Sequence, residues 1–140
     1  MMTDHAEALA KAVHAVLRDD FHVQDSFGEP PRLYDAAPED PVFPYLTYGA
    51  MRSEDIGADE TPLSAHQMTL HIWSRYAGRA EVLTLIRRVN AALTAETLTA
   101  AGDIAVRSAN PIYSDILRAP DGFTRHGVLR LSFTVQGDAI

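Results

Sequence analysis

The sequence predicts an α+β domain in which two helices pack on one face of a mainly antiparallel sheet of about four strands. Two segments, residues 3–20 and 79–94, carry apolar residues at helical spacing. Segments rich in β-favouring residues follow each of them. The resulting order, α-β-β-α-β-β, is typical of a sheet covered on one face by helices.

The composition is that of one compact globular domain. The chain has 140 residues, of which 46% are hydrophobic and 22% charged, so we expect a single domain over residues 1–140 with its own core. There are no cysteines, which excludes disulfides, thiolate metal ligands and cysteine nucleophiles. Neither a membrane-spanning apolar run nor a signal peptide is expected.

The charge balance argues against a nucleic-acid-binding protein. The formal net charge is −7, and an acidic surface repels phosphate backbones. Basic residues also do not cluster with aromatic ones, as they do in a nucleic-acid groove. The same repulsion would suit a passage through which DNA slides without being bound.

The first half of the chain contains one predicted helix and one predicted strand, separated by a proline-rich segment. Residues 25–44 hold five of the eight prolines and include RLYDA, a candidate short edge strand. Residues 45–52 follow a proline and are rich in β-favouring residues, so they are predicted to form a strand. The apolar stripe of the first helix consists of Leu9, Val13, Val16 and Leu17.

The acidic stretch DDFHVQD, residues 19–25, follows the first predicted helix. Its three acids and one histidine raise the hypothesis of a divalent-metal loop. The stretch lacks the ligand spacing and the glycine of a calcium loop. We therefore interpret it as a solvated helix end.

A long polar connection and a second strand follow. Residues 53–65, SEDIGADETPLSA, contain four acids and no base, and we expect a connection longer than an ordinary hairpin turn. Residues 66–75 are predicted to form a strand. Met68, Leu70 and Ile72 would face one side of it, and Gln67, Thr69, His71 and Trp73 the other.

The second half of the chain repeats the helix–strand–strand order. Residues 79–94 carry an apolar stripe at Val82, Ile86, Val89 and Leu93, with Gly78 as the expected N-cap. Residues 104–118 are interrupted by Asn110-Pro111, which indicates a bulge or an edge strand. Residues 127–136 alternate apolar and polar side chains, as a half-buried strand does.

Motifs that carry chemistry are missing from the sequence. It has no nucleophile motif and no phosphate-binding glycine loop. His66 and His71 are an odd number of residues apart on one predicted strand and so face opposite sides, which prevents them from sharing a metal ion. We therefore expect no catalytic, metal-binding or cofactor-binding residues and no enzymatic activity.

The stretch HIWSRYAGRAE, residues 71–81, combines a histidine, the only tryptophan, two arginines and a glutamate. One interpretation is a general base with an anion clamp, and another is an ordinary solvated surface. A third is an interface, because Trp, Tyr and Arg are enriched at docking hot spots. We favour the interface. His71 has no evident partner at usable spacing.

Three longer segments together resemble a known family. They are RLYDAAPEDPVFPYLTYG, HQMTLHIWSRYAGRAEVLTLIRRVNAAL and DGFTRHGVLRLSFTV, and they occur in this order within about residues 5–136. The chain resembles the small tail-completion proteins of long-tailed phages, prophages and gene transfer agents. The resemblance implies a structural tail terminator with an α+β fold.

Such a terminator forms a ring, usually a hexamer, at the head-proximal end of the tail tube. It ends tube polymerisation and joins the tail to the head–neck connector. The implied partners are copies of the chain, the major tail-tube protein and the connector or stopper protein, and DNA passes through the lumen. The implied location is the bacterial cytoplasm during assembly, then the neck end of the particle.

Interface residues follow from residue type and position. An acidic patch would complement a basic one, because a ring needs two different surfaces on each subunit. Two alternatives stay open: another neck or head-completion protein, such as a stopper, and a small ligand-binding or catalytic domain using His71, Arg75 and Arg79. The predicted interface residues are Glu54, Asp55, Asp59, Glu60, Trp73, Arg75, Arg79, Arg87 and Arg88.

Overall fold

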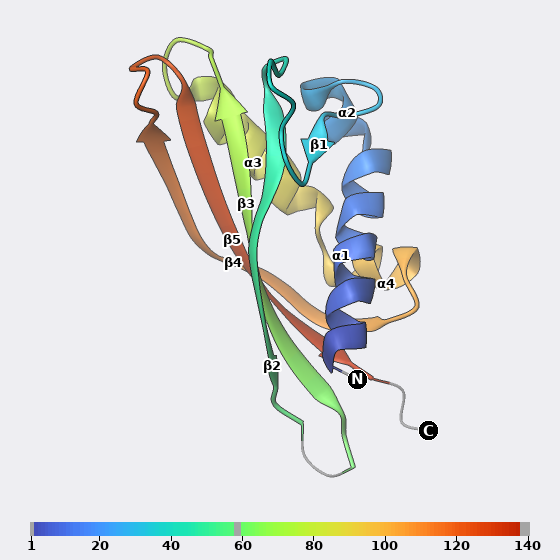
Figure 1. Ribbon diagram of the computed structural model, residues 1–140. Coiled ribbons are helices and arrows are strands. Elements are labelled where there is room, and N and C mark those ends of the chain that lie inside the picture. The colour runs from blue at the N-terminus through green and yellow to red at the C-terminus, as the bar shows by residue number, and fades with distance from the viewer. Residues whose placement is uncertain (1, 58–59, 138–140) are drawn as a thin grey trace.

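The computed structural model describes residues 2–57 and 60–137, which form four helices and one five-stranded sheet (Figure 1). The chain folds in the order α1, α2, β1, β2, β3, α3, α4, β4, β5. The helices are α1 (Met2–Asp19), α2 (Phe21–Phe27), α3 (Ala80–Ala92) and α4 (Ala95–Ala101). The strands are β1 (Leu33–Tyr34), β2 (Tyr45–Asp55), β3 (Leu63–Ser74), β4 (Ala105–Arg118) and β5 (Arg125–Gln136).

The sheet has the strand order β1-β2-β3-β5-β4 and is antiparallel except for the short β1–β2 pair. The helices lie on one face of it, and the other face is open (Figure 1). The predicted α+β class and the mainly antiparallel sheet are confirmed. The helix count was too low, because α2 and α4 are additional. Among the described residues, no helix has both the length and the apolarity that crossing a membrane requires.

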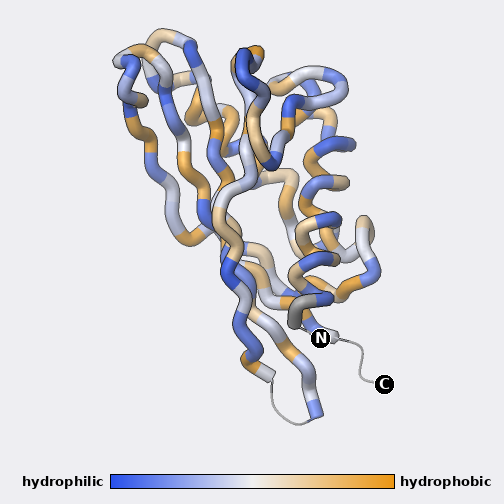
Figure 2. The backbone as a smooth tube through the Cα atoms, in the orientation of Figure 1, coloured by the Kyte–Doolittle hydropathy of each residue, from blue (hydrophilic) through white to orange (hydrophobic). Residues whose placement is uncertain are grey.

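The core lies between the helices and the sheet face that they cover. The predicted apolar stripes are confirmed: Leu9, Val13 and Leu17 of α1 are fully buried, and so are Val82 and Val89 of α3. The facing strand residues are buried as well. They are Leu46, Met68, Leu70, Ile72, Leu129, Leu131, Phe133 and Val135. Figure 2 shows that both the helices and the strands contain hydrophobic stretches alternating with hydrophilic ones.

Helix α3 packs directly on β5 at Gly127. A Cβ atom at this position would lie 2.6 Å from Val82 Cγ2 and 3.2 Å from Ile86 Cδ1. Only a residue without a side chain allows this approach. Gly127 therefore sets how closely α3 lies over the centre of the sheet.

The predicted polar connection over residues 53–65 is wrong in its extent. Strand β2 continues to Asp55 and β3 already begins at Leu63, with Glu54 paired to Ala65 and Asp55 to Ser64. The two strands form a long hairpin that extends beyond the helices (Figure 1). The outer part of β2 is mostly hydrophilic (Figure 2). A strand segment with no core to cover needs no apolar alternation, which is why the sequence pattern resembles a loop there.

Helix α2 replaces the solvated helix end that was predicted for residues 19–25. Asp20 caps it, because one carboxylate oxygen accepts a hydrogen bond from the backbone N–H of Val23 at 3.0 Å. Val23 and Phe27 of this helix are fully buried. Asp20, one of the three acids in the metal-loop hypothesis, thus serves as a helix N-cap.

The predicted helix over residues 79–94 corresponds to α3, and the additional helix α4 follows directly after it. Helix α3 ends at Ala92, and α4 begins after the N-cap Thr94. Thr94 and Thr97 form a capping box, in which each side chain bonds the other residue's backbone N–H. The N-cap of α3 is Arg79 rather than Gly78, and the Arg79 side chain makes no capping hydrogen bond.

Candidate functional site

The open face of the sheet carries a compact group of aromatic side chains near the start of β5. Trp73 stacks on His126, with ring centroids 3.9 Å apart and planes 9° apart, and on Tyr45 at 6.1 Å. The register brings the three together, because Trp73 pairs with Tyr45 on one side and with His126 on the other. The aromatic patch, as we call it, consists of Phe43, Tyr45, His71, Trp73, Arg75, Phe123 and His126.

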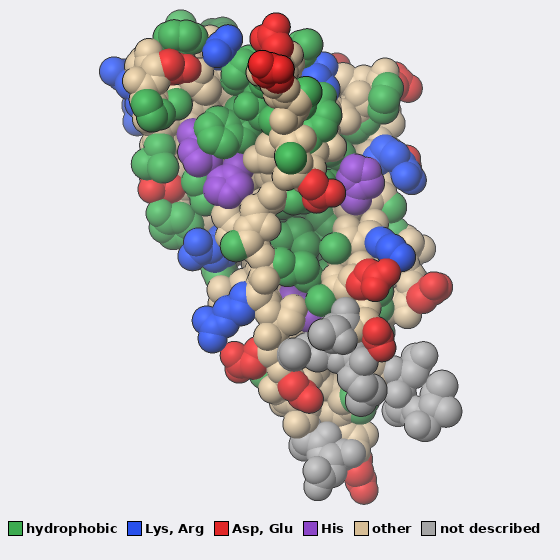
Figure 3. Space-filling view, in the orientation of Figure 1, with side chains coloured by type: hydrophobic (Ala, Val, Ile, Leu, Met, Phe, Trp, Pro, Cys, Tyr) green, Lys and Arg blue, Asp and Glu red, His purple; other side chains and the backbone are tan. Residues whose placement is uncertain are grey.

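His71 has a partner that the sequence did not reveal. Its Nδ1 atom lies 2.7 Å from Nε2 of His126, which comes from β5 and is 55 residues away in sequence. The expectation that His71 lacks a partner is therefore wrong. Burial lowers the pKa of both imidazoles, and the nearby His71 lowers that of His126 further. Histidine side chains gather among hydrophobic ones over the upper part of the visible sheet face (Figure 3).

Arg75 is held in place by other residues of the same chain. Its guanidinium carbon lies 4.2 Å above the Phe43 ring and 5.0 Å from the Phe123 ring. Its Nε atom donates to the Thr124 hydroxyl at 3.2 Å, and Nη2 lies 4.0 Å from a carboxylate oxygen of Asp121. The guanidinium therefore joins the segment before β2 to the β4–β5 turn. Trp73 and Arg75 lie together as predicted, with Arg75 exposed and Trp73 half-buried.

The acidic hairpin, which we define by Glu54, Asp55 and Glu60, forms the free end of the β2–β3 arm. All three side chains are exposed. Within the described parts of the chain, Glu54 makes one weak ion pair, at 3.7 Å from the guanidinium of Arg52, which is also exposed. Acidic side chains gather over the lower part of the visible face (Figure 3). Asp59, the fourth predicted acid, lies outside the described residues.

The predicted basic residues of α3 differ in their surroundings. Arg88 is tied to α2, because its Nη1 lies 3.0 Å from an Asp25 carboxylate oxygen and donates to the Ser26 hydroxyl at 2.8 Å. Arg79 and Arg87 are exposed, and neither makes an ion pair within residues 2–57 and 60–137. Only these two of the four predicted arginines are available to an outside partner without breaking an internal contact.

A groove of about 480 Å³ lies between α3 and the edge strand β4. It is lined by Leu83, Ile86, Arg87, Asn90, Pro111, Tyr113, Ser114 and Leu129. Strand β4 pairs with β5 on one side only, and its Ile112, Tyr113 and Leu117 are close to half exposed. Bulges interrupt its register next to Val106 and Pro111, which confirms the predicted edge position. We call this surface the α3–β4 edge.

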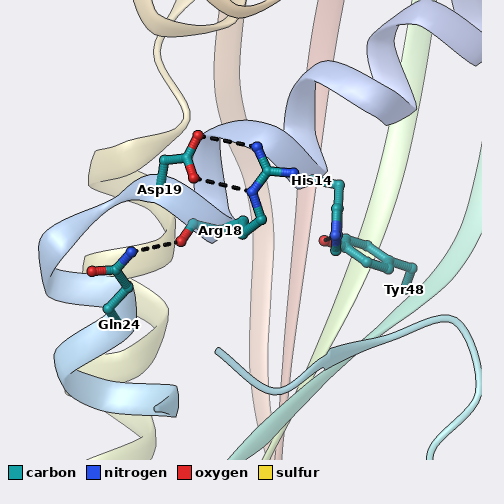
Figure 4. Close-up of polar contacts among 5 residues, drawn as sticks. All are labelled: His14, Arg18, Asp19, Gln24 and Tyr48. Atoms are coloured by element: carbon teal, nitrogen blue, oxygen red, sulfur yellow. Dashed lines mark hydrogen bonds and ion pairs between the residues drawn. The ribbon is translucent and has the colours of Figure 1, made fainter. Parts of the chain in front are cut away.

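A second hollow, of about 620 Å³, lies between α1 and β2. The Tyr48 hydroxyl and Nδ1 of His14 are 2.8 Å apart inside it (Figure 4). Burial raises the pKa of Tyr48, so its hydroxyl stays neutral at physiological pH. Nearby, Arg18 forms two hydrogen bonds with Asp19, and Gln24 donates to the Arg18 carbonyl, which closes the α1–α2 corner (Figure 4).

These arrangements provide binding surfaces and structural contacts. In the parts of the chain that the structure describes, no three His, Cys, Asp or Glu side chains come close enough together to hold a metal ion. The His71–His126 pair has no hydroxyl or thiol nucleophile bonded to it. The aromatic patch, the acidic hairpin and the α3–β4 edge have the residue types of docking surfaces.

Comparison with protein families gives one match that covers almost the whole chain. Residues 5–136 match the model of the tail completion protein gp17 family. The chain belongs to this family. The resemblance inferred from the sequence is thereby confirmed, and the protein is a structural tail-completion protein of phage type. No curated protein matches the sequence.

Two solved structures have a fold similar to that of this tail completion protein. One is a chain in the virion of a native gene transfer agent particle, with a TM-score of 0.81 and 22% identity over 94% of this chain and 97% of that chain. The other is the gp17 protein of bacteriophage SPP1, with a TM-score of 0.59 and 20% identity over 96% and 94%. At these identities the likeness establishes the fold.

Proposed function

We propose that this tail completion protein is a tail terminator. It forms a ring at the head-proximal end of a tail tube, ends tube polymerisation and joins the tail to the head–neck connector. The observation that carries the proposal is the family match over residues 5–136, and the presence of unlike surfaces on one subunit, among them the acidic hairpin and the α3–β4 edge, agrees with it. A closed ring requires two such surfaces on each subunit, because its contacts are heterologous.

The partners proposed are further copies of the chain, the major tail-tube protein and the connector or stopper protein. A hexamer is expected from the family resemblance. The chain would assemble in the bacterial cytoplasm and then occupy the neck end of the tail. The occurrence of the same fold in a gene transfer agent virion supports a place in the particle.

The acidic character of the chain supports a position around the DNA path. With a net charge of −7 for each chain, a ring of several copies would have a strongly negative surface. Such a surface repels the phosphate backbone, so DNA passes without sequence-specific binding.

The proposal is tested by electron microscopy of the purified protein, alone and mixed with tail-tube protein. We expect six-fold rings that cap one end of each tube, and tubes that stop growing once capped. Tubes that keep growing in the presence of excess protein, with bare ends, would contradict the terminator function.

Charge reversal in the acidic hairpin sharpens this test. We expect Glu54→Lys combined with Asp55→Lys to leave the fold intact and to reduce ring formation or capping. The matched control is Glu39→Lys combined with Asp40→Lys, which reverses two adjacent exposed acids in the proline-rich loop. If both double variants cap tubes equally well, the acidic hairpin is not part of the interface.

A further inference from the structure

Three arginines line one hollow at the upper end of the sheet. Arg79 precedes α3, Arg118 ends β4 and Arg125 begins β5. The arginine hollow, as we call it, has a volume of about 270 Å³ and is lined by Gly78, Arg79, Ile116, Leu117, Arg118 and Arg125. Within the described residues, none of the three guanidinium groups makes a hydrogen bond or an ion pair with another part of the chain.

The arrangement leaves positive charge uncompensated. Nη1 of Arg125 is buried and has no hydrogen-bond partner. Arg118 and Arg125 are also direct cross-strand partners. A buried donor without an acceptor is costly, and like charges opposite each other destabilise a strand pair. An anion in the hollow would offset the repulsion between Arg118 and Arg125.

The start of α3 adds to the same field. This helix has 13 residues, and its N-cap Arg79 supplies no side-chain hydrogen bond. The acid in its first turn, Glu81, accepts a hydrogen bond from the Ser74 hydroxyl at 2.7 Å and offsets only part of the positive charge. A helix N-terminus carries a partial positive charge and attracts anions. Guanidinium groups bind carboxylates through paired, charge-assisted hydrogen bonds. The hollow is thus suited to carboxylate oxygens.

The acidic hairpin has the complementary chemistry. Glu54, Asp55 and Glu60 are exposed, and within residues 2–57 and 60–137 the only ion pair that they make is the weak one from Glu54 to Arg52. The hairpin lies at the opposite end of the sheet from the β4–β5 turn beside the hollow (Figure 1). One chain therefore cannot place its own hairpin in its own hollow. The contact requires a second copy, oriented head to tail.

We propose that the arginine hollow is a carboxylate-binding site that receives the acidic hairpin of a neighbouring copy of the chain. The proposal rests on the terminator function, for which it names the contact between adjacent subunits. It also changes the basic residues of the predicted interface: Arg79 stays, Arg118 and Arg125 are added, and Arg75 and Arg88 keep their internal contacts.

Cysteine cross-linking tests the contact directly, because the natural chain has no cysteine. One variant carries Ile116→Cys, which lines the hollow and lies on the same face of β4 as Arg118, and the other carries Thr61→Cys next to the acidic hairpin. Both keep every arginine and acid of the proposed contact. When the two variants are mixed and oxidised, alone or on tail-tube ends, we expect a disulfide-linked dimer that neither variant forms alone. The matched control is Ala100→Cys, an exposed position on α4, mixed with Thr61→Cys.

Charge reversal supplies the second measurement. Arg79→Glu combined with Arg118→Glu should reduce the yield of the linked dimer about tenfold or more, since several charge-assisted bonds are lost. Adding Glu54→Arg and Asp55→Arg to the hairpin variant should restore it. Failure of the dimer to form both in solution and on tube ends would overturn the proposal. So would binding of duplex DNA that the arginine reversals abolish, because the hollow would then be a phosphate site.

The outcomes separate this inference from the terminator function. A chain that forms the linked dimer and leaves tube ends bare contradicts only the terminator function. A chain that caps tubes without the linked dimer contradicts only the hairpin-to-hollow contact.

Discussion

At the scale of single residues, buried and half-buried histidines join neighbouring strands at two places. His71 and His126 bond across β3 and β5 within the aromatic patch. His66 is fully buried where the β2–β3 arm leaves the body, with its two ring nitrogens 2.7 and 2.8 Å from the hydroxyls of Ser53 and Ser64. All three imidazoles therefore sit in positions that favour their neutral form.

Acidification is expected to destabilise the protein. Burial is the main cause that lowers the pKa of His66, His71 and His126 in the folded state. The unfolded chain, with histidine pKa values of about 6.5, then binds protons more readily than the folded chain. The stability from these groups is fully present above about pH 6.5 and is lost as the pH falls through the lower folded values. Thermal unfolding should show a lower Tm at about pH 5.5 than at about pH 7.5.

Measuring Tm against pH for the His126→Gln variant isolates the contribution of the His71–His126 pair. This variant should show a smaller loss of Tm on acidification than the natural chain. An unchanged pH dependence would mean that the His71–His126 pair does not contribute.

Replacing His66 tests the buried hydrogen-bond chain at the base of the arm. His66→Ala should lower the free energy of unfolding by about 1–3 kcal/mol, because the Ser53 and Ser64 hydroxyls each lose a buried partner. Urea unfolding measures this loss, and Gln67→Ala, at the exposed neighbouring position, is the control. Equal stability of the two variants would contradict the structural role of His66.

The residue-scale features show what a single sequence can and cannot reveal. Strand parity placed His71 and Trp73 on one face correctly, because side chains alternate in any strand. The partners His126 and Tyr45 come from other strands, and the register that joins them has no local signature. The same holds for Arg118 and Arg125, which become neighbours only when β4 pairs with β5.

At the scale of elements, the helices and the hairpin differ in how well their secondary structure can be predicted from their sequences. The stripes of α1 and of α3 cover a core and were predicted, since core-facing helices repeat apolar residues at regular spacing. Helices α2 and α4 have seven residues each, too few for a periodic pattern. The outer part of the β2–β3 arm covers no core, so its acidic sequence is like that of a loop and led to the prediction of one.

The contact between α2 and α3 gives a prediction at this scale. Arg88→Ala removes the bonds to Asp25 and Ser26, and should lower the free energy of unfolding by about 1 kcal/mol, since the guanidinium is partly buried. The matched control is Arg87→Ala at the exposed neighbouring position, which should have almost no effect. Chemical denaturation of both variants gives the comparison. A larger loss for the Arg87 variant would rule out this role of Arg88.

At the scale of the whole molecule, charge is distributed unevenly along the sheet. The acidic hairpin projects at one end and the arginine hollow lies at the other, so copies attract each other in one direction only. A contact of this kind repeats around a closed ring or along an open filament. Capping of tail tubes requires the closed form.

Salt should therefore weaken the assembly more than it weakens the fold. Raising the ionic strength from about 0.1 M to about 1 M shortens the Debye length from about 10 Å to about 3 Å and screens exposed charges. We expect rings to dissociate in this range by sedimentation or microscopy, while the Tm of the subunit changes little. Rings that persist or strengthen in high salt would assign the contact to the apolar side chains of the α3–β4 edge instead.

The irregular edge strand β4 has a consequence for the cell that makes this protein. An open strand with exposed Ile112, Tyr113 and Leu117 is a template on which further strands can add and grow into aggregates. Pro111 cannot donate a backbone hydrogen bond, and the two bulges beside Val106 and Pro111 interrupt the straight run of backbone groups. A foreign strand can therefore pair with only part of this edge. Subunits that have not yet assembled are thus protected against precipitation.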